Sequence, residues 1–297
     1  MLVRVLGSAA GGGVQQWNCG CEYCVAAVCD PALARTGCSV AVSADGSGWT
    51  VLNAAAELPG QLAGFRALRP HSGARETPFA QLMLTDAELD HTLGLLLLRH
   101  AAALTVAATP TVRSLLDGVL RLLGGYLTVV WREITAGTDF PFDPSRPAGL
   151  CARAIPVGSG KPPAYAGADR VPADAAVALR VSDPRGGSFV YAPCVPALTG
   201  ALLDACRESS LILLDGTFFS DDELVRCGKP RTARQLGHLP VDGPDGSLAQ
   251  LESAMRTRVV YTHLNNTNPM LAGNSAASEQ VRNAGAAVAI DGAEYEV

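Results

Sequence analysis

Residues 85–91, TDAELDH, place one histidine and three carboxylates in seven positions, directly after the apolar run 79–84. Helix capping is the simplest explanation of such acidic residues, because carboxylates stabilise the positive end of a helix dipole. Capping accounts for one or two of the carboxylates. It does not account for an Asp-His pair followed closely by the apolar run 93–98. We therefore interpret Asp90 and His91 as metal-binding or catalytic residues.

Two other apolar runs are also followed by potential ligands. LILL precedes Asp215, and VVYT precedes His263. Taken alone, Asp215 is explained by an Asx turn that closes a strand, and a single histidine after a strand is usually a hydrogen-bonded polar residue. Because all three signals follow apolar runs, one sheet edge could bring Asp90, His91, Asp215 and His263 together.

His238 lies between these segments, in the sequence LGHLP. We interpret it as a general acid or a substrate contact rather than a metal ligand, because histidine is the commonest proton-transfer residue in enzymes. An ordinary surface-loop histidine is the alternative.

The sequence WNCGCEYC places Cys19, Cys21 and Cys24 within six residues. Three thiols at this spacing are typical of a structural Zn²⁺ site, which needs a fourth ligand from elsewhere in the chain. Coincidence and redox-active thiols are the alternatives. The preceding glycines 11–13 do not form a phosphate-binding loop, because no Gly-Lys-Ser/Thr follows them. An odd total of nine cysteines argues against a disulfide framework.

Composition excludes several classes of protein. The chain has 297 residues, 48% hydrophobic and 17% charged, and contains no stretch that reads as a linker, so we expect one domain over residues 1–297. A net charge of −5 without a cluster of Lys and Arg argues against a nucleic-acid partner. The apolar run 93–98 is far shorter than the roughly 20 residues of a membrane span. The first residues lack signal-peptide features, so we expect a cytoplasmic protein with no membrane partner.

The elements that must position these residues follow from apolar runs and turn signals. We expect strands at 2–6, 39–43, 49–53, 79–85, 104–108, 176–181, 188–191, 211–214 and 259–261. We expect helices at 55–65, 92–99, 110–123, 197–206 and 247–256, with Thr109 as an N-cap, and an irregular region at 135–171. Strands with interleaved helices indicate a layered α/β fold, whose sites lie beyond the strand ends.

Six segments occur here in the order found in the PqqB family of pyrroloquinoline quinone (PQQ) biosynthesis, part of the metallo-β-lactamase superfamily. They are LGSAAGGGVQQWNCGCEYC, LTDAELDHTLGLL, KPPAY, LLLDGTFFSDDE, LGHLP and THLNNTNPML. The chain resembles this family from end to end. The resemblance implies a four-layer αββα sandwich with a metal site at one edge of its two sheets.

The resemblance also implies a ligand set. The superfamily carries the motif H-x-H-x-D-H, and Asp86 and Glu88 here occupy its first two histidine positions. Only Asp90 and His91 keep the pattern, while Asp215 and His263 stand at the positions of the bridging aspartate and the final histidine. A single metal ion held by Asp90, His91, Asp215 and His263 is therefore expected.

Two histidines and a carboxylate with open positions suit Fe(II) and O₂ chemistry. By resemblance, we expect an Fe(II)-dependent oxygenase that hydroxylates a tyrosine-like amino acid or short peptide, with catalytic roles for Asp90 and His238. The Cys19, Cys21 and Cys24 group is expected to hold structural Zn(II). The alternatives are a zinc hydrolase, such as a phosphodiesterase or lactonase, and a non-catalytic carrier of PQQ or its precursor. The oligomeric state is left open, with a homodimer among the alternatives.

The chain departs from the family pattern near the expected site. Ala55, Ala56 and Glu57 stand where the family has Ser-Pro-Asp, and Cys194 stands where it has Gly. Related cysteine-zinc proteins often carry a histidine where this chain has Asn266, so the fourth zinc ligand is unassigned. These differences fit a paralogue that oxidises a different aromatic amino acid or peptide.

Overall fold

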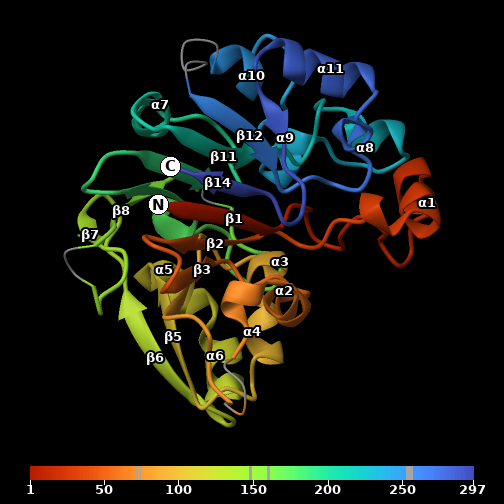
Figure 1. The fold of residues 1–297 in the computed structure, drawn as a ribbon. Helices are drawn as coiled ribbons and strands as arrows, with labels where there is room; N and C mark the ends of the chain where they lie inside the picture. The colour runs from red at the N-terminus through yellow and green to blue at the C-terminus, as the bar shows by residue number, and fades with distance from the viewer. Residues whose placement is uncertain (71–72, 74, 147–148, 159–160, 252–256) are drawn as a thin grey trace.

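The computed structural model describes every residue except 71–72, 74, 147–148, 159–160 and 252–256, and contains two seven-stranded sheets (Figure 1). In order across the first sheet lie β14 (Glu294–Glu296), β1 (Leu2–Gly7), β2 (Ser39–Ser43), β3 (Trp49–Leu52), β4 (Gln81–Met83), β5 (Ala103–Ala108) and β6 (Thr128–Glu133). Across the second lie β13 (Ala287–Val288), β12 (Arg258–Thr262), β11 (Leu211–Asp215), β10 (Ser188–Ala192), β9 (Val177–Ser182), β8 (Cys151–Pro156) and β7 (Asp139–Pro141).

Both sheets are mixed. Strands β3 to β6 are parallel to one another, as are β10 to β13, and the remaining pairs are antiparallel. Parallel neighbours place their carboxyl ends at the same edge of a sheet, so segments that follow β4, β11 and β12 are held at defined sheet edges.

Side chains alternate between the two faces of each strand. In β2, Val40 and Val42 belong to the core between the sheets, whereas Ala41 faces an outer layer. In β11, Leu213 faces the core between the sheets, whereas Ile212 and Leu214 face the other outer layer.

Helices cover both outer faces. On the first sheet lie α2 (Leu58–Gly64), α3 (Leu89–Thr92), α4 (Gly94–Leu97), α5 (Pro110–Leu115) and α6 (Asp117–Gly124). On the second lie α7 (Gly200–Arg207), α10 (Ser247–Gln250) and α11 (Ala276–Asn283), with the short helices α8 (Glu223–Arg226) and α9 (Ala233–Leu236) nearby. The expected αββα sandwich is confirmed. No helix within the described residues is long and apolar enough to cross a lipid bilayer.

Several expected boundaries were wrong. The region 135–171 contains β7 and β8. Two of the three buried positions of β8 are alanines, which are weak β-formers. The helix expected at 92–99 begins earlier, at Leu89, and is divided at Leu93 into α3 and α4. A Cβ on Gly94 would lie 2.2 Å from the Ala55 carbonyl oxygen, so this close approach requires glycine. The helix expected at 247–256 is described only to Leu251, and the rest of it lies outside the described residues.

Thr109 caps α5 as expected, because its hydroxyl accepts a hydrogen bond from the Val112 amide at 3.2 Å. The helix α1 (Glu22–Cys29) follows the glycine run and lies at the side of the sandwich (Figure 1). It was not expected from the sequence, where the cysteine spacing dominated the interpretation.

Candidate metal centre

Three residues from two separate segments meet beyond the strand ends. Asp90 and His91 lie in α3, after β4, and His263 directly follows β12. Asp90 Oδ2 lies 3.0 Å from His263 Nε2, and the rings of His91 and His263 are 4.9 Å apart between centroids. Each of the three offers a ligand atom within 4.8 Å of the other two, so they form a group that could hold one metal ion.

His91 is oriented by Asp86. Its Nδ1 lies 2.9 and 2.8 Å from the two Asp86 carboxylate oxygens, which also accept hydrogen bonds from the Thr85 hydroxyl and the Glu88 amide. The opposite nitrogen, Nε2, is buried without a hydrogen-bond partner in the described structure. Burial opposes charge on His91, but the Asp86 and Asp90 carboxylates outweigh it and raise its pKa to about 9. The surroundings of this imidazole therefore favour a cation.

His263 is oriented by Thr217. The Thr217 hydroxyl lies 2.6 Å from Asp215 Oδ1 and 2.7 Å from His263 Nδ1. Because the hydroxyl gives its single proton to the carboxylate, it accepts from His263 Nδ1–H. In a neutral ring Nε2 then carries a lone pair that faces Asp90 Oδ2. Two lone pairs at 3.0 Å require a proton or a metal ion between them.

The backbone at His263 is also unusual. Its φ of 59° lies in the left-handed region, which is rare for a residue other than glycine. Such a conformation persists only where the surrounding contacts hold it. Here the amides of Leu264 and Asn265 donate to the carbonyls of Ser8 and Thr217.

Asp215 and His238 form an adjacent pair. Asp215 Oδ2 accepts from the Val195 amide at 2.7 Å and lies 2.8 Å from His238 Nδ1, while Oδ1 accepts from the amide and hydroxyl of Thr217. Asp215, His238 and His263 thus form a second group of potential ligands, which shares His263 with the Asp90 group. The two acceptor oxygens of Asp215 are engaged in orienting His238 and Thr217. Its expected role as a ligand of the same ion stays a prediction.

The His238 ring stacks on His263, with 5.6 Å between centroids and 26° between planes. Since Nδ1 is paired with Asp215, Nε2 is the nitrogen left to meet a substrate or an ion. This placement is compatible with the expected substrate or acid–base role, which stays a prediction.

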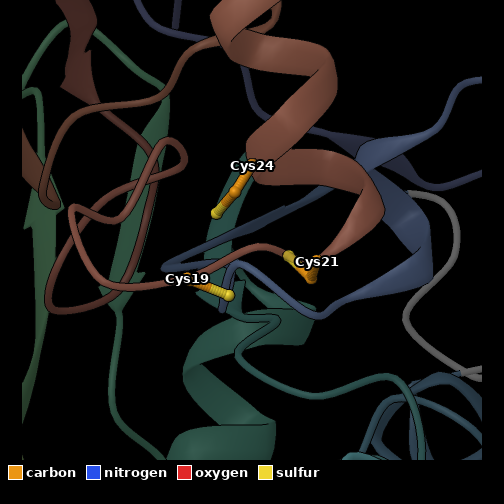
Figure 2. A group of neighbouring side chains, drawn as sticks. All are labelled: Cys19, Cys21 and Cys24. Carbon is orange, nitrogen blue, oxygen red and sulfur yellow. The ribbon is translucent and has the colours of Figure 1, made fainter.

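The three N-terminal cysteines form another group (Figure 2). Cys19 and Cys21 precede α1 and Cys24 lies in it, and their sulfurs turn toward a shared space. Asn266 Nδ2 donates to Cys24 Sγ at 3.3 Å and contacts Cys21 Sγ at 3.7 Å, while the Gln16 amide donates to Cys24 Sγ at 3.3 Å. Three sulfurs within 4.8 Å of one another, with amide donors around them, fit a tetrahedral zinc ion.

The surroundings of these thiols affect their pKa values differently. Burial raises the pKa of Cys21 to about 11. Burial acts in the same direction at Cys24, but hydrogen bonds from Asn266 and the Gln16 amide outweigh it and lower the pKa of that thiol. Asn266 therefore stabilises thiolate at the position where related zinc sites often carry a histidine.

A cavity of about 450 Å³ opens onto Asp90. Residues that line it include Glu57, Glu88, Leu89, Asp90, Leu93 and Tyr165. Leu89 and Leu93 are 50% and 42% exposed, although both are large and apolar. The cavity thus combines an apolar wall with carboxylates.

Sequence reasoning missed some residues that build this site. Asp86 was noted only because it replaces a histidine of the superfamily motif. In the structure it orients His91. Thr217 carried a weak signal, since it follows the Asp-Gly pair at the end of an apolar run. Tyr165, whose hydroxyl donates to the Ala87 carbonyl at the cavity wall, ends the KPPAY segment that supported the family resemblance, but that segment was assigned no role in the site.

Comparisons with known proteins agree with the fold. A family model described as "Beta-lactamase superfamily domain" matches residues 48–264. The chain is 37% identical over 309 residues to "Coenzyme PQQ synthesis protein B" of Pseudomonas savastanoi pv. phaseolicola, and 37% identical over 310 residues to that of Pseudomonas protegens, in each case with full coverage of both chains.

Among solved structures, Zn²⁺-bound PqqB from Methylobacterium extorquens matches with a TM-score of 0.89 and 32% identity over the whole of both chains. A diphosphatase of the PhnP family matches with a TM-score of 0.71 and 19% identity, covering 100% of this chain and 97% of that one, and this likeness shows the fold alone.

Proposed function

The chain belongs to the PqqB family of the β-lactamase superfamily, and on that premise we propose that it is a metal-dependent oxygenase. Its substrate is a tyrosine-like amino acid or short peptide, which it hydroxylates in the biosynthesis of a quinone cofactor or a related natural product. The Cys19, Cys21 and Cys24 group holds a structural zinc ion in this proposal.

The observation that carries the proposal is the Asp90, His91 and His263 group, with the buried His91 Nε2 lacking a partner. These atoms fit one metal ion. The adjacent Asp215, His238 and His263 group shares His263 with this site, and both Asp215 oxygens already accept hydrogen bonds. The superfamily motif supplies two further histidines, which this chain lacks. Asp86 stands in one of those positions and is bonded to His91 Nδ1 through both oxygens. This favours a mononuclear site over the dinuclear zinc site of a hydrolase.

Fe(II) held by two imidazoles and one carboxylate supplies O₂-dependent oxidation chemistry when bound. The residues of the chain orient and hold the ligands. Asp86 and Thr217 fix the ring orientations of His91 and His263 through Nδ1, which leaves each Nε2 for the ion. His238, fixed by Asp215, is placed to accept or return a proton at Nε2.

The cavity at Asp90 supports the substrate class. Leu89, Leu93 and Tyr165 provide apolar surface against which an aromatic ring can pack. Glu57 is held by the Gly37 amide at 3.2 Å, and with Glu88 it adds two carboxylates to the cavity wall. An ammonium group on the substrate would balance this charge, as an amino acid or the N-terminus of a peptide provides.

The activity is tested by anaerobic loading with Fe(II) or Zn(II), followed by O₂ uptake and mass spectrometry with tyrosine-containing candidates. The assay includes a two-electron reductant such as ascorbate, which reduces the second oxygen atom of O₂ to water. We expect O₂ uptake and a product heavier by one oxygen atom with Fe(II) only. Hydrolysis by the zinc-loaded protein would favour a hydrolase. Stoichiometric retention of a quinone without O₂ uptake would favour a carrier.

The substrate class is tested by binding alone. Zinc-loaded protein is titrated with tyramine and with 4-ethylphenol, which differ only in the amino group. We expect tyramine to bind about tenfold more tightly, and Glu57→Gln to remove most of that preference. Glu279→Gln, which alters an exposed residue of α11, is the matched control. Equal binding of both compounds would contradict recognition of an ammonium group.

A further inference from the structure

A chain of buried hydrogen bonds begins at His91 and runs into the first sheet. Asp86, which orients His91, accepts from the Thr85 hydroxyl at 2.7 Å. Thr85 is in turn held by Asn53, whose Oδ1 accepts from the Thr85 amide at 2.9 Å and whose Nδ2 donates to the Thr85 hydroxyl at 3.0 Å. Asn53, Thr85 and Asp86 are each at most 3% exposed.

The chain then crosses to the second sheet. Tyr191, in β10, accepts from Asn53 Nδ2 at 3.3 Å, and its hydroxyl lies 3.2 Å from Cys38 Sγ. Cys38 precedes β2 of the first sheet, and its sulfur lies 3.6 Å from the hydroxyl of Thr262, the last residue of β12. Thr262 is bonded through its peptide to His263.

Only the first contact of this path has a fixed donor, because Asn53 Nδ2 donates to the phenol oxygen. In the contacts of Cys38 Sγ with the Tyr191 and Thr262 hydroxyls, either group can donate. An unbroken series of polar contacts therefore connects His91, which follows the first sheet, with the residue before His263, which follows the second.

Burying these polar groups costs folding free energy, and a phenylalanine at position 191 would avoid burying one hydroxyl. Asn53 also has a φ of 60°, a left-handed conformation that asparagine tolerates better than most residues. Its amide donates to the Met83 carbonyl, and the next amide, that of Ala54, donates to the His91 carbonyl at 2.7 Å. His91 is thus supported twice: by the backbone next to Asn53, and by the Asn53 side chain through Thr85 and Asp86.

We propose that Asn53 and the Tyr191 hydroxyl are positioning residues that fix the separation and orientation of His91 and His263 through this network. The inference rests on the metal centre of the proposed function. Neither residue contacts the ion, and both act through Asp86 on one side and Thr262 on the other.

The test measures Mn²⁺ binding by electron paramagnetic resonance, without turnover. Carboxylate and imidazole sites suit Mn²⁺, whereas thiolates select softer metals, so the cysteine group contributes little to the signal. We expect Tyr191→Phe to weaken Mn²⁺ binding several-fold and Asn53→Gly about tenfold, since losses of supporting residues fall near that range. Glycine accepts the left-handed backbone, so the second variant removes only the side chain.

Tyr261→Phe is the matched control, since Tyr261 is a fully buried tyrosine in β12 whose hydroxyl bonds Ser247 in an outer core. Urea unfolding of each variant separates a general loss of stability from a loss of metal affinity. Unchanged Mn²⁺ binding in both Tyr191→Phe and Asn53→Gly would overturn the inference, as would equal weakening in Tyr261→Phe.

A double-mutant cycle tests the route. If Asn53 acts through Asp86, Asn53→Gly costs little additional affinity in an Asp86→Asn background. If the losses of Mn²⁺ affinity in Asn53→Gly and Asp86→Asn add fully, Asn53 does not act through Asp86. A protein that binds Mn²⁺ normally but consumes no O₂ when loaded with Fe(II) would contradict the oxygenase proposal and leave the network inference standing.

Discussion

The Asp90, His91 and His263 group and the cysteine group differ in what holds their ligands in place. In the first, His91 and His263 have Nδ1 bonded by Asp86 and Thr217, and both lie against the ends of buried strands. In the second, three thiols lie beside α1, a helix at the side of the sandwich (Figure 1).

The packing around the two groups differs accordingly. The buried apolar cluster associated with the α1 region consists of Ala9, Val14 and Ala27, whereas the sheets enclose large cores. The first group is organised by the fold before any ion binds. We expect the second to depend more on a bound ion, because the packing around it is smaller.

The largest expected effect is that of His263→Ala. Removing this ligand should abolish Fe(II) binding at the first group and O₂-dependent turnover, while the cysteine group keeps its zinc. Metal analysis and circular dichroism would check both statements. Because position 263 is left-handed, His263→Gly serves as a second variant without backbone strain. Retained oxidation in both variants would defeat the proposed site.

Cys24→Ser should have the next largest effect, confined to the other group. Loss of one thiolate should release zinc and reduce hydrogen-exchange protection in residues 14–30 by about 100-fold or more, because a structural zinc supplies much of the local stability. Cys29→Ser, at the exposed end of α1, is the matched control. Unchanged protection without zinc would show that this segment is organised by packing after all.

Thr217→Val should weaken metal binding at the first group by about 10- to 100-fold, because His263 loses the partner of its Nδ1. Thr217→Ser restores the hydroxyl and should recover most of the affinity. Calorimetric titration of the metal-free protein would measure this. Equal affinity in wild type and Thr217→Val would show that packing alone orients the ring.

The smallest effect on metal binding at either group should come from Glu223→Gln. Glu223 contacts Thr267, which lies in the loop that carries both His263 and Asn266. Glu223 accepts from the Thr267 hydroxyl and the Phe219 amide, yet burial raises its pKa to about 7. A folded-state pKa above the unfolded value of 4.5 means that the folded state binds the proton more tightly. The resulting stabilisation is complete below pH 4.5 and is lost as the pH rises through about 7.

The measurement is urea unfolding of wild type and Glu223→Gln across this range of pH. Wild type should lose stability relative to the variant as the pH rises, while metal binding at both groups stays within about twofold. Parallel stability profiles for the two proteins would show that Glu223 does not titrate in this window.

The meeting of Asp90, His91 and His263 could be predicted, because each follows an apolar run that is recognisable as a strand. The fold followed from the resemblance, and the order of apolar runs agreed with it. The division between α3 and α4 could not be predicted, because at this point the Gly94 amide donates to the carbonyl of Ala54, a residue far away in sequence, at 2.9 Å.

It was harder to predict what each residue does in the site than to predict which residues lie in it. Asp86 and Asp90 are both aspartates in one short segment, and only the structure shows that Asp86 faces His91 Nδ1 while Asp90 faces His263. Asn53 and Tyr191 gave no signal, since their importance arises from a contact between two sheets.

The pairing of β1 with β14 constrains the timing of folding during synthesis. In the first sheet β1 lies between β2 and β14, and Val3 pairs with Tyr295. Until the ribosome has made β14, near the end of the chain, the edge of β1 that pairs with it has no partner strand. A chaperone that shields this exposed strand in the nascent chain would reduce the aggregation to which unpaired edges are prone.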